Sequence, residues 1–356
     1  LRDWKNSVGA GPYMLTDYVV GNAISFEKNP NYWETDPFIP ANRLPYADKF
    51  KILIIPDRST QLAALRSGKI DRLLGVTWEE QQSLTQTNPE LKLRQIWGAG
   101  SGWYLPCNVA PYSDIRVRQA LSMALNRDTI IKDFYHGAAL RLAWVVLPEN
   151  PEYTPFDQLP ANIKEILSYN PTKAKQLLAD AGYPTGFKMT LTCMSTPPIP
   201  DLTALCQAMW QQIGLDVSIK VLEPAAFNST LYGHKYTWPM YSAWQGQYLE
   251  GNLDVCRTGY PNNHTLVSNP EYDKMADALV GADPRDPATR NKLAKELNLY
   301  MLEKSYCIPL PTGNLFVFWQ PWLKQYGGEV AMGYCHYYKP MAYAWVDQQL
   351  KKSLGK

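Results

Sequence analysis

The middle of the chain alternates strand and helix in an order that restricts the fold to one class. Residues Phe187–Cys193 alternate apolar and polar positions as a strand does, and Leu215–Val221 shows a second strand pattern. Between them, Leu202–Ile213 repeats apolar residues at helical spacing and ends at Gly214. Because two strands joined through a helix run parallel, this segment predicts a βαβ unit within a helix-covered parallel sheet.

Helix start and stop signals place further elements on both sides of this unit. The strongest helical pattern is Ser113–Tyr135, capped by Ser113 or Asp114. A cap residue followed by proline marks three more helix starts, at Asn170–Pro171, Asn269–Pro270 and Asp286–Pro287. Towards the start of the chain we expect strands Lys49–Ile55 and Leu91–Trp97, a short helix stopped at Gly68 and a helix Trp78–Thr87. These signals predict a central α/β domain of about residues 105–310, flanked by segments that belong to another domain.

The composition excludes several classes of function. The 356 residues carry a net charge of +2, with Lys and Arg scattered along the chain, which argues against nucleic acid or an anionic membrane as the main partner. No apolar run approaches the roughly 20 residues that span a bilayer. The chain has 12 Trp and 23 Tyr, and such an excess of amphipathic rings is typical of binding surfaces as well as of a large aromatic core.

Motifs for catalysis and metal binding are largely missing from the sequence. None of the four histidines stands three or four residues from another, and the six cysteines are dispersed without C-x-x-C spacing, so no zinc site is expected. GAGSGW (Gly98 to Trp103) has glycines but no following helix, so we interpret it as a flexible approach to a strand. Paired carboxylates for glycoside hydrolysis remain open, and disulfide pairing cannot be read from these spacings.

One polar, aromatic stretch stands apart from the core-like patterns. YSAWQGQYLEGN (Tyr241 to Asn252) sets aromatic rings beside two glutamines and holds no basic residue. Rings supply contact area at low entropic cost, and a glutamine amide both donates and accepts hydrogen bonds. The stretch is therefore either core or the wall of a binding pocket.

The chain as a whole resembles the family 5 extracellular solute-binding proteins of ABC importers. GAGPYMLTDYVVGNAISFEKNPNYW (Gly9 to Trp33) is similar to the G-T-G-P-Y…R-N-P-x-Y-W signature of that family. The likeness continues in order through IIPDRSTQLAALRSGKID, SDIRVRQALSMALNRDTII, YNPTKAKQLLADAGYPTGF, NPEYDKMADAL and YCIPLP. Each of these motifs alone is only weakly specific for the family. Their occurrence in the same order along nearly the whole chain makes the resemblance specific.

This resemblance implies an α/β fold of the two-lobed periplasmic-binding-protein class, type II, cluster C. Family members begin with a strand of lobe I and a small extra domain upstream of the first signature, and we expect both to be absent from these residues. The resemblance then implies a partial lobe I at 1–104, a nearly complete lobe II at 105–310 and a return segment to lobe I at 311–356. The crossing strands would lie near Gly102–Asn108 and Ile308–Asn314.

The resemblance also gives the polar, aromatic stretch a role. Peptide-binding relatives carry G-W-x-A-D-Y on the strand that runs along the ligand, and here the matching residues are Ala243 to Tyr248. The implied ligand-binding residues are Trp244, Gln245, Gln247 and Tyr248 on this strand, Trp103 and Tyr104 at the crossing, and Trp238 and Tyr241 before the strand. For the last four, packing at the base of the lobe is an equal alternative.

Gln247 stands where peptide receptors hold the aspartate that pairs with the free α-amino group of the ligand. A buried ammonium without an opposing charge is costly, and a neutral amide compensates poorly. We therefore rank a neutral solute rich in hydroxyl or amide groups above a peptide with a free amine. An alignment slip that makes Glu250 the acid keeps the peptide reading open.

The resemblance implies the solute-binding component of an ABC importer, which closes around its ligand by hinge motion without chemistry. We expect no cofactor, a small solute such as an oligopeptide or sugar oligomer, ABC permease subunits as partners, no nucleic acid, and a monomer. The expected location is the periplasm or the cell surface, as an anchored lipoprotein. The alternatives are a non-transport ligand sensor or scaffold on the same fold and, third, a hydrolase.

Overall fold

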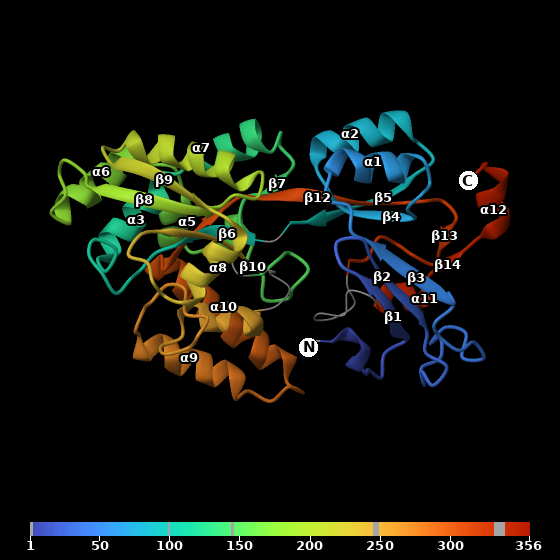
Figure 1. Cartoon of the computed structure of the whole chain (residues 1–356). Coiled ribbons are helices and arrows are strands. Elements are labelled where there is room, and N and C mark those ends of the chain that lie inside the picture. Colours follow the sequence, from blue (N-terminus) through green and yellow to red (C-terminus); the bar gives the residue numbers. More distant parts are fainter. Residues whose placement is uncertain (1–2, 99, 144–145, 245–248, 331–338) are drawn as a thin grey trace. The chain divides into compact units, whose positions relative to one another are not determined.

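The computed structural model describes residues 3–98, 100–143, 146–244, 249–330 and 339–356. The chain divides into two compact units, which are described separately (Figure 1). Unit 1 combines residues 1–96 with 314–356, and unit 2 is the continuous stretch 97–313. The expected residues Gln245, Gln247 and Tyr248 lie outside the described ranges.

Unit 2 holds one mixed sheet and most of the helices. Its strands are β6 (Gly100–Tyr104), β7 (Ala139–Leu140), β8 (Lys188–Met194), β9 (Asp216–Leu222), β10 (Met240–Trp244) and β11 (Cys307–Leu310). Its α-helices are α3 (Ile115–Met123), α4 (Arg127–Thr129), α5 (Ala161–Leu167), α6 (Pro171–Asp180), α7 (Ile199–Gln211), α8 (Pro224–Tyr232), α9 (Pro270–Val280) and α10 (Pro287–Lys304). A π-helical turn spans Ile130–Phe134, and 3-10 turns span Phe156–Gln158 and Leu249–Cys256.

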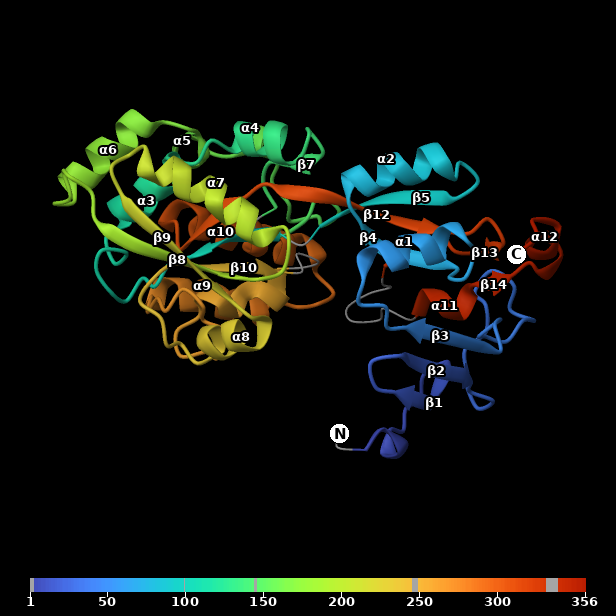
Figure 2. The same ribbon diagram turned by 45° about the horizontal axis from the view of Figure 1, so that its top comes forward.

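The sheet of unit 2 has the strand order β11-β6-β10-β8-β9 and carries helices on both faces (Figure 2). Helices α3, α6 and α7 contribute to one core cluster together with Trp103, and α9 and α10 contribute to a second cluster together with Tyr104. Successive residues of a strand point to opposite faces, so these two neighbours on β6 reach different cores. The helices on both faces of this sheet agree with the strand–helix pattern, and the parallel part of the sheet is formed by β10, β8 and β9.

The predicted βαβ unit is confirmed. β8 and β9 pair in parallel from Lys188 opposite Asp216 to Met194 opposite Leu222, with α7 between them in the chain. The helix starts marked by proline are also confirmed: Asn170, Asn269 and Asp286 each accept a backbone N–H bond with their side chain at the N-cap of α6, α9 and α10.

The single long helix predicted from Ser113 to Tyr135 is wrong. The helix α3 ends at Met123, and a separate short turn begins after Asn126. The Asn126 side chain accepts a hydrogen bond from the N–H of Thr129 at 3.1 Å, so it caps a new helical start. A side chain that bonds the local backbone competes with the continuing helix, and apolar periodicity does not reveal that competition.

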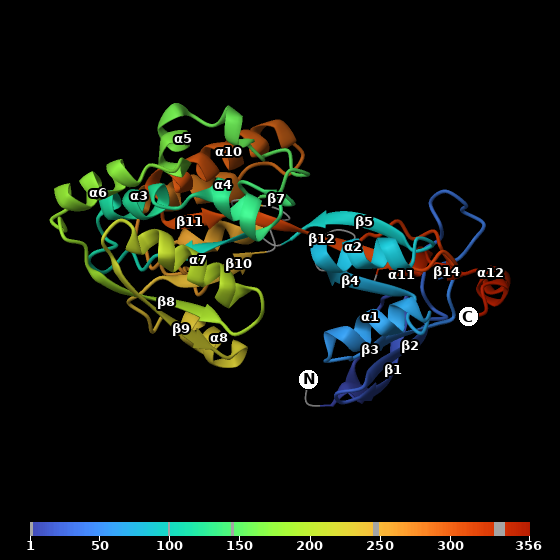
Figure 3. The same ribbon diagram turned by 90° about the horizontal axis from the view of Figure 1, so that it is seen from above.

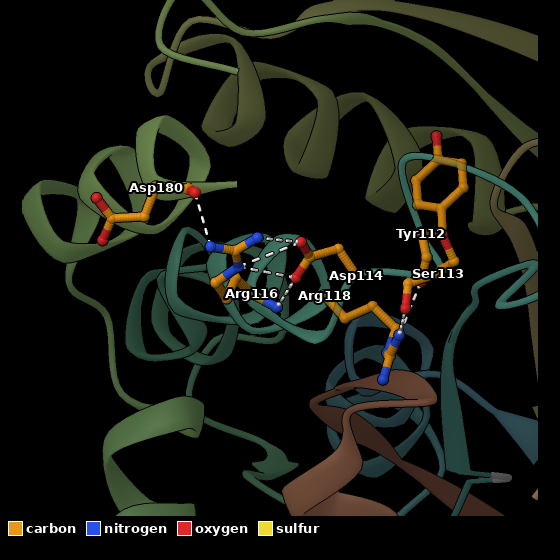
Figure 4. Close-up of polar contacts among 6 residues, drawn as sticks. All are labelled: Tyr112, Ser113, Asp114, Arg116, Arg118 and Asp180. Carbon is orange, nitrogen blue, oxygen red and sulfur yellow. Dashed lines mark hydrogen bonds and ion pairs between the residues drawn. The ribbon is translucent and has the colours of Figure 1, made fainter. Parts of the chain in front are cut away.

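Polar contacts fix the beginning of α3 against the rest of unit 2 (Figure 4). Asp114 caps the helix and pairs with Arg116, which also donates to the Asp180 carbonyl oxygen at 2.7 Å. The adjacent Arg116 guanidinium lowers the pKa of the Asp114 carboxyl. Arg118 is buried and donates to the carbonyl oxygens of Tyr112 and Ser113. These contacts fix the segment between β6 and α3 within unit 2.

Unit 1 contains two small sheets and a two-stranded ribbon. Its strands are β1 (Tyr13–Val19), β2 (Ala23–Lys28), β3 (Lys49–Leu53), β4 (Arg72–Val76), β5 (Lys92–Trp97), β12 (Thr312–Trp319), β13 (Leu323–Lys324) and β14 (Trp345–Val346). Its helices are α1 (Arg58–Arg66), α2 (Trp78–Thr87), α11 (Lys339–Tyr343) and α12 (Gln348–Ser353), with a 3-10 turn at Trp4–Asn6. The sheets are β1-β2-β3 and β4-β12-β5, and β13 pairs with β14.

The core of unit 1 follows the alternation of β12. Phe316 and Phe318 pack with Leu65 and Leu84 of α1 and α2, whereas Val317 and Trp319 face the segments around β13 and β14. β12 pairs antiparallel with β4, which joins residues far apart in the sequence within one unit.

The unit boundaries differ from those expected at 104 and 310. The divisions fall between residues 96 and 97 and between 313 and 314. The first shift has a clear cause, because β6 pairs with both β10 and β11 and so belongs to the unit 2 sheet. The interpretation of the two units as the lobes of a receptor stays a prediction.

Candidate functional site

The carboxyl edge of the unit 2 sheet is the candidate site. β10 runs parallel to β8, and β10 and β11 both run antiparallel to β6. Consequently β8, β9, β10 and β11 all end at the same edge of the sheet. In the sheet, β9 lies on one side of β8, and β10, the strand that follows β9 in the sequence, lies on the other side of β8. In open α/β sheets, ligands bind outside the carboxyl ends of strands where the strand order reverses in this way.

This edge brings together the ends of several elements. β8 ends at Met194, followed by Ser195, whose N–H donates to the Leu222 carbonyl oxygen at the end of β9 at 2.8 Å. β10 ends at Trp244, which lies opposite Gly100 at the start of β6. Helix α7 begins at the same edge, because it follows β8. The switch point therefore lies between Met194 and Trp244.

The predicted ligand residues do not all gather at this edge. Trp244 is the last residue of β10, and Gln245, Gln247 and Tyr248 follow it outside the described ranges. Trp238 precedes β10 and is 37% exposed, so it lies towards the amino end of that strand. A five-residue strand is roughly 17 Å long, which separates the two tryptophans along the sheet.

Three other predicted residues are packed inside unit 2. Trp103 and Tyr241 lie opposite each other on β6 and β10, with ring centroids 5.7 Å apart, and Trp103 makes a second edge contact with Trp210. Tyr104 lies on the opposite face, with its ring centroid 5.5 Å from that of His264. All three rings are buried, and their contact with a ligand stays a prediction.

Burial keeps the hydroxyl group of Tyr241 protonated. Desolvation raises the pKa of Tyr241 to about 12, although a hydrogen bond with Ser101 acts in the opposite direction. Tyr241 therefore stays neutral at physiological pH and acts as a hydroxyl-bearing core residue. Its packing against Trp103 fixes β10 beside β6 up to the point where β10 ends.

The glycines of GAGSGW have a different role from the one expected. Gly100 and Gly102 lie within β6, the fully buried strand between β10 and β11, so the reading as a flexible approach is wrong. A Cβ atom on Gly102 would meet the Ile308 carbonyl oxygen at 2.6 Å. A glycine inside a strand marks such a close approach of another backbone, and this signal was available in the sequence.

Two polar residues near the edge were missed by sequence reasoning. Ser101 is buried on β6 opposite Ala243, and its hydroxyl interacts with Tyr241. Thr312 follows the end of β11 and is buried, and its Oγ1 has no hydrogen-bond partner. A buried hydroxyl without a partner is unusual in a folded protein. Neither residue belongs to a pattern that marks it in the sequence.

Within the described ranges, no group of three His, Cys, Asp or Glu side chains is placed to hold a metal ion. The five cysteines there, Cys107, Cys193, Cys206, Cys256 and Cys307, are free thiols, and Cys335 lies outside those ranges. In the same part of the chain, no helix combines the length and apolar character needed to cross a bilayer.

Comparison with known families decides the classification. Residues 2–268 match the model of the bacterial extracellular solute-binding proteins, family 5 middle region. The chain belongs to this family. The resemblance carried by the ordered motifs is therefore confirmed, and the members and structural neighbours of the family are binding proteins.

Relatives of this family 5 protein differ in the ligand that their names state. Heme-binding protein A of Haemophilus influenzae is 27% identical over 332 residues, which are 90% of this chain and 57% of the relative. The dipeptide-binding protein of Escherichia coli is 29% identical over 225 residues, which are 61% of this chain and 39% of the relative. The chain thus spans about half the length of the curated relatives it matches.

A solved structure confirms the fold. The ABC transporter-associated periplasmic binding protein DppA from Helicobacter pylori, in complex with the peptide STSA, superimposes with a TM-score of 0.78. The match is 23% identical in sequence and covers 97% of this family 5 chain and 64% of the other. The predicted α/β fold of the periplasmic-binding-protein class is confirmed.

Proposed function

We propose that this family 5 protein is the extracytoplasmic solute-binding component of an ABC importer. The observation that carries the proposal is the match of residues 2–268 to a family of solute-binding proteins. The topology supports it, because the strand aligned with the ligand strand of peptide receptors ends at the switch point of the unit 2 sheet. The partners are then permease subunits, and the protein acts as a monomer in the periplasm or as a lipoprotein at the cell surface.

The ligand contacts are assigned to the end of β10 and the residues after it. Trp244 and Tyr248 would stack on the solute, and Gln245 and Gln247 would donate and accept hydrogen bonds. Trp103, Tyr104 and Tyr241 support β10 from the two cores, and Trp238 is a more distant candidate.

A neutral, polar solute fits these residues better than a peptide with a free amine. Gln247 cannot neutralise an ammonium group, and a buried unpaired charge is strongly disfavoured. Relatives named for heme and for dipeptides show that one family accommodates different chemical classes. We propose a peptide-like or other polar solute with a flat face for stacking, bound without a cofactor and without chemical change.

Native mass spectrometry of the protein expressed from its complete reading frame tests this function. A non-covalent small molecule that is retained in the gas phase and released unchanged on denaturation is the expected result. Release of a chemically altered product would instead point to an enzyme.

The variant Trp244→Ala tests the proposed contact. We expect it to weaken binding of the recovered solute by about two- to tenfold, because aromatic stacking contributes roughly 0.5–1.5 kcal/mol beyond the burial of apolar area. Trp33→Ala is a matched control, since Trp33 is 76% exposed and lies in unit 1. Equal affinities for Trp244→Ala and the wild type, in folded proteins, would contradict the assignment.

A non-transport sensor or scaffold on the same fold is the second candidate. It is favoured by the replacement of the peptide receptors' acid with Gln247. Uptake of the recovered solute by cells that lack the protein distinguishes the two, because a transport receptor is required for uptake and a sensor is not.

A further inference from the structure

Two histidine rings of unit 2 lie close together, and each carries a buried nitrogen atom that no protein group satisfies. The ring centroids of His234 and His264 are 6.4 Å apart. Among the described residues, neither Nε2 of His234 nor Nδ1 of His264 has a hydrogen-bond partner, and both atoms are buried. His264 as a whole is only 6% exposed. Buried polar atoms nearly always have a partner, so two such nitrogens in neighbouring rings indicate a binding site.

His234 is held in a strained backbone conformation at the end of α8. Its N–H donates to the Leu231 carbonyl oxygen at 3.1 Å. The N–H of Lys235 donates to the Thr230 carbonyl oxygen at 3.2 Å, which completes a Schellman motif with His234 at its left-handed position. The φ angle of His234 is +51°, a region that glycine ordinarily occupies. A histidine here costs conformational free energy, and such strain is typical of residues whose side chain has a function.

Packing around the end of α8 fixes the position of His264 relative to His234. Helix α8 packs against the ends of β8 and β9 (Figure 3), and its Leu231 forms a buried cluster with Tyr236. The Tyr236 hydroxyl donates to the His264 carbonyl oxygen. The His264 ring contacts Tyr104 and Tyr232, with centroid distances of 5.5 and 5.1 Å. These contacts from three segments set the spacing of the two imidazole rings.

The histidine pair is separate from the proposed solute contacts. Tyr104, which packs on His264, lies opposite Met240 at the first position of β10, whereas Trp244 is the last residue of that strand. Four residues of strand correspond to roughly 13 Å. Tyr232 lies beside the pair and is 58% exposed, so this place is reached from the surface of unit 2. The inference therefore does not rest on the proposed function.

The spacing of the rings restricts what can join the two nitrogens. A direct N–H···N hydrogen bond of about 2.9 Å would bring the centroids to roughly 5.2 Å or less. A metal ion about 2.0–2.1 Å from an imidazole nitrogen lies roughly 3.2 Å from the ring centroid. Two rings on opposite sides of one ion then have centroids about 6.4 Å apart, and two rings at a tetrahedral angle about 5.2 Å. The observed 6.4 Å corresponds to the linear arrangement.

The surroundings of the pair favour an ion of low charge. Burial lowers the pKa of His264 to about 4, so its ring is neutral at physiological pH and offers a lone pair to a metal. The neighbouring side chains Tyr104 and Tyr232 are aromatic, and a doubly charged ion is costly in such a setting. Copper is among the metals that imidazole binds, and its monovalent ion accepts two nitrogen ligands in a line.

We propose that His234 and His264 form a two-ligand site for monovalent copper, which Nε2 of His234 and Nδ1 of His264 bind from opposite sides. The ion satisfies both buried nitrogens at once and explains why a histidine occupies the strained position at the end of α8. Two protein ligands are sufficient for this geometry. The site thus agrees with the lack of any group of three metal-binding side chains in the described ranges.

Titration with Cu⁺ tests the site in the protein expressed from its complete reading frame. The titration is run without oxygen and in competition with a colorimetric Cu⁺ chelator, and X-ray absorption then identifies the atoms bound to the first equivalent. We expect one tightly bound ion with two nitrogen neighbours. Sulfur neighbours would assign the copper to thiols such as Cys107 and would overturn the proposal.

A matched pair of variants separates metal binding from a structural role. His234→Gly should weaken Cu⁺ binding by at least about a hundredfold, because it removes one of the two ligands. It should not destabilise the metal-free protein, since glycine accepts the left-handed backbone. His136→Gly is the control, because His136 is exposed and has a similar φ of +53°. Equal Cu⁺ affinities for His234→Gly and the wild type would show that the pair is not the site.

Nitrogen NMR of the imidazole rings distinguishes the ion from a bridging water molecule. A buried water ordinarily makes about three hydrogen bonds, whereas these rings offer two unpaired nitrogens. One equivalent of Cu⁺ should shift the ring resonances of His234 and His264 and leave those of His136 unchanged. If the resonances of His234 and His264 do not respond to Cu⁺, the two nitrogens share a water molecule and the proposal is wrong.

Discussion

At the scale of single residues, one buried arginine connects three segments of unit 2 through backbone carbonyl oxygens. The guanidinium of Arg127 is buried and donates to the carbonyl oxygens of Ser122, Leu167 and Pro309 at 3.0 to 3.1 Å. Desolvation is the main reason that the pKa of Arg127 is lowered from its usual value. Because its acceptors lie on three separate segments, one side chain ties β11 to the α3 end and to α5.

The buried imidazole of His264 should make stability depend on pH. Burial, with a smaller effect of neighbouring His234, lowers the pKa of His264 to about 4. In the unfolded chain this group titrates near 6.5, so between about pH 6.5 and 4 only the unfolded state binds the proton and the folded state loses stability. The loss should reach about 3 kcal/mol, measured by urea denaturation across this range.

Two histidine variants check the origin of that pH dependence. His264→Phe, whose ring can pack against Tyr104 and Tyr232, should remove most of it. His136→Phe, at an exposed position, should retain it. If His264→Phe loses stability with falling pH as steeply as the wild type, another group is responsible.

A second single-residue change tests the chemistry of the ligand. Gln247→Asp should shift binding towards solutes with a free amine, since an aspartate can pair with an ammonium group. The measurement is the affinity of the complete protein for matched ligands with free and acetylated amines, with Gln82→Asp, at an exposed position in unit 1, as the control. No gain for any cationic ligand would remove the role assigned to Gln247.

At the scale of elements, the close approach of β6 and β11 limits the size of the side chains that β6 can carry. Gly102→Ala should destabilise the protein by about 2 kcal/mol or more, because the added methyl group would meet the Ile308 carbonyl oxygen at 2.6 Å. Gly11→Ala is the control, since nothing lies within 4 Å of a Cβ atom there. Urea denaturation should therefore separate the two variants, and similar midpoints would contradict the packing of β6 against β11.

Elements with strong local signals could be predicted from the sequence, and elements set by competition between signals could not. The caps at Asn170, Asn269 and Asp286 act within one helical turn, so the residues alone identify those helices. The break after Met123 depends on Asn126 competing with a continuing apolar stripe. The central position of β6 depends on distant strands β10 and β11, which no local pattern contains. No local sequence pattern marks Thr312 either, because its burial depends on distant segments. Trp244, by contrast, was identified through the family motif.

At the scale of the whole molecule, the two units should differ in their ability to fold alone. The three core clusters described in unit 2 are all built from residues 97–313, whereas the core of unit 1 needs Phe316 and Phe318 from beyond that stretch. A fragment of residues 97–313 should therefore show cooperative urea unfolding, and a fragment of residues 1–96 should not. Circular dichroism of the two fragments measures this, and an unfolded 97–313 fragment would contradict the independence of unit 2.

The hydrogen bond between Gly98 and Gly313 has a consequence for the order of folding during synthesis. The N–H of Gly98 donates to the Gly313 carbonyl oxygen at 3.1 Å, so folded unit 2 brings its own two ends together. Otherwise β5 and β12 would have to meet across a flexible loop of about 220 residues, at an entropic cost of roughly 5 kcal/mol. Most of unit 2 leaves the ribosome before β12 does, and once folded it brings β12 close to β5, its neighbour in the sheet. During translation, most of unit 2 is therefore synthesised before β12, and its folding lowers the entropic cost of completing unit 1.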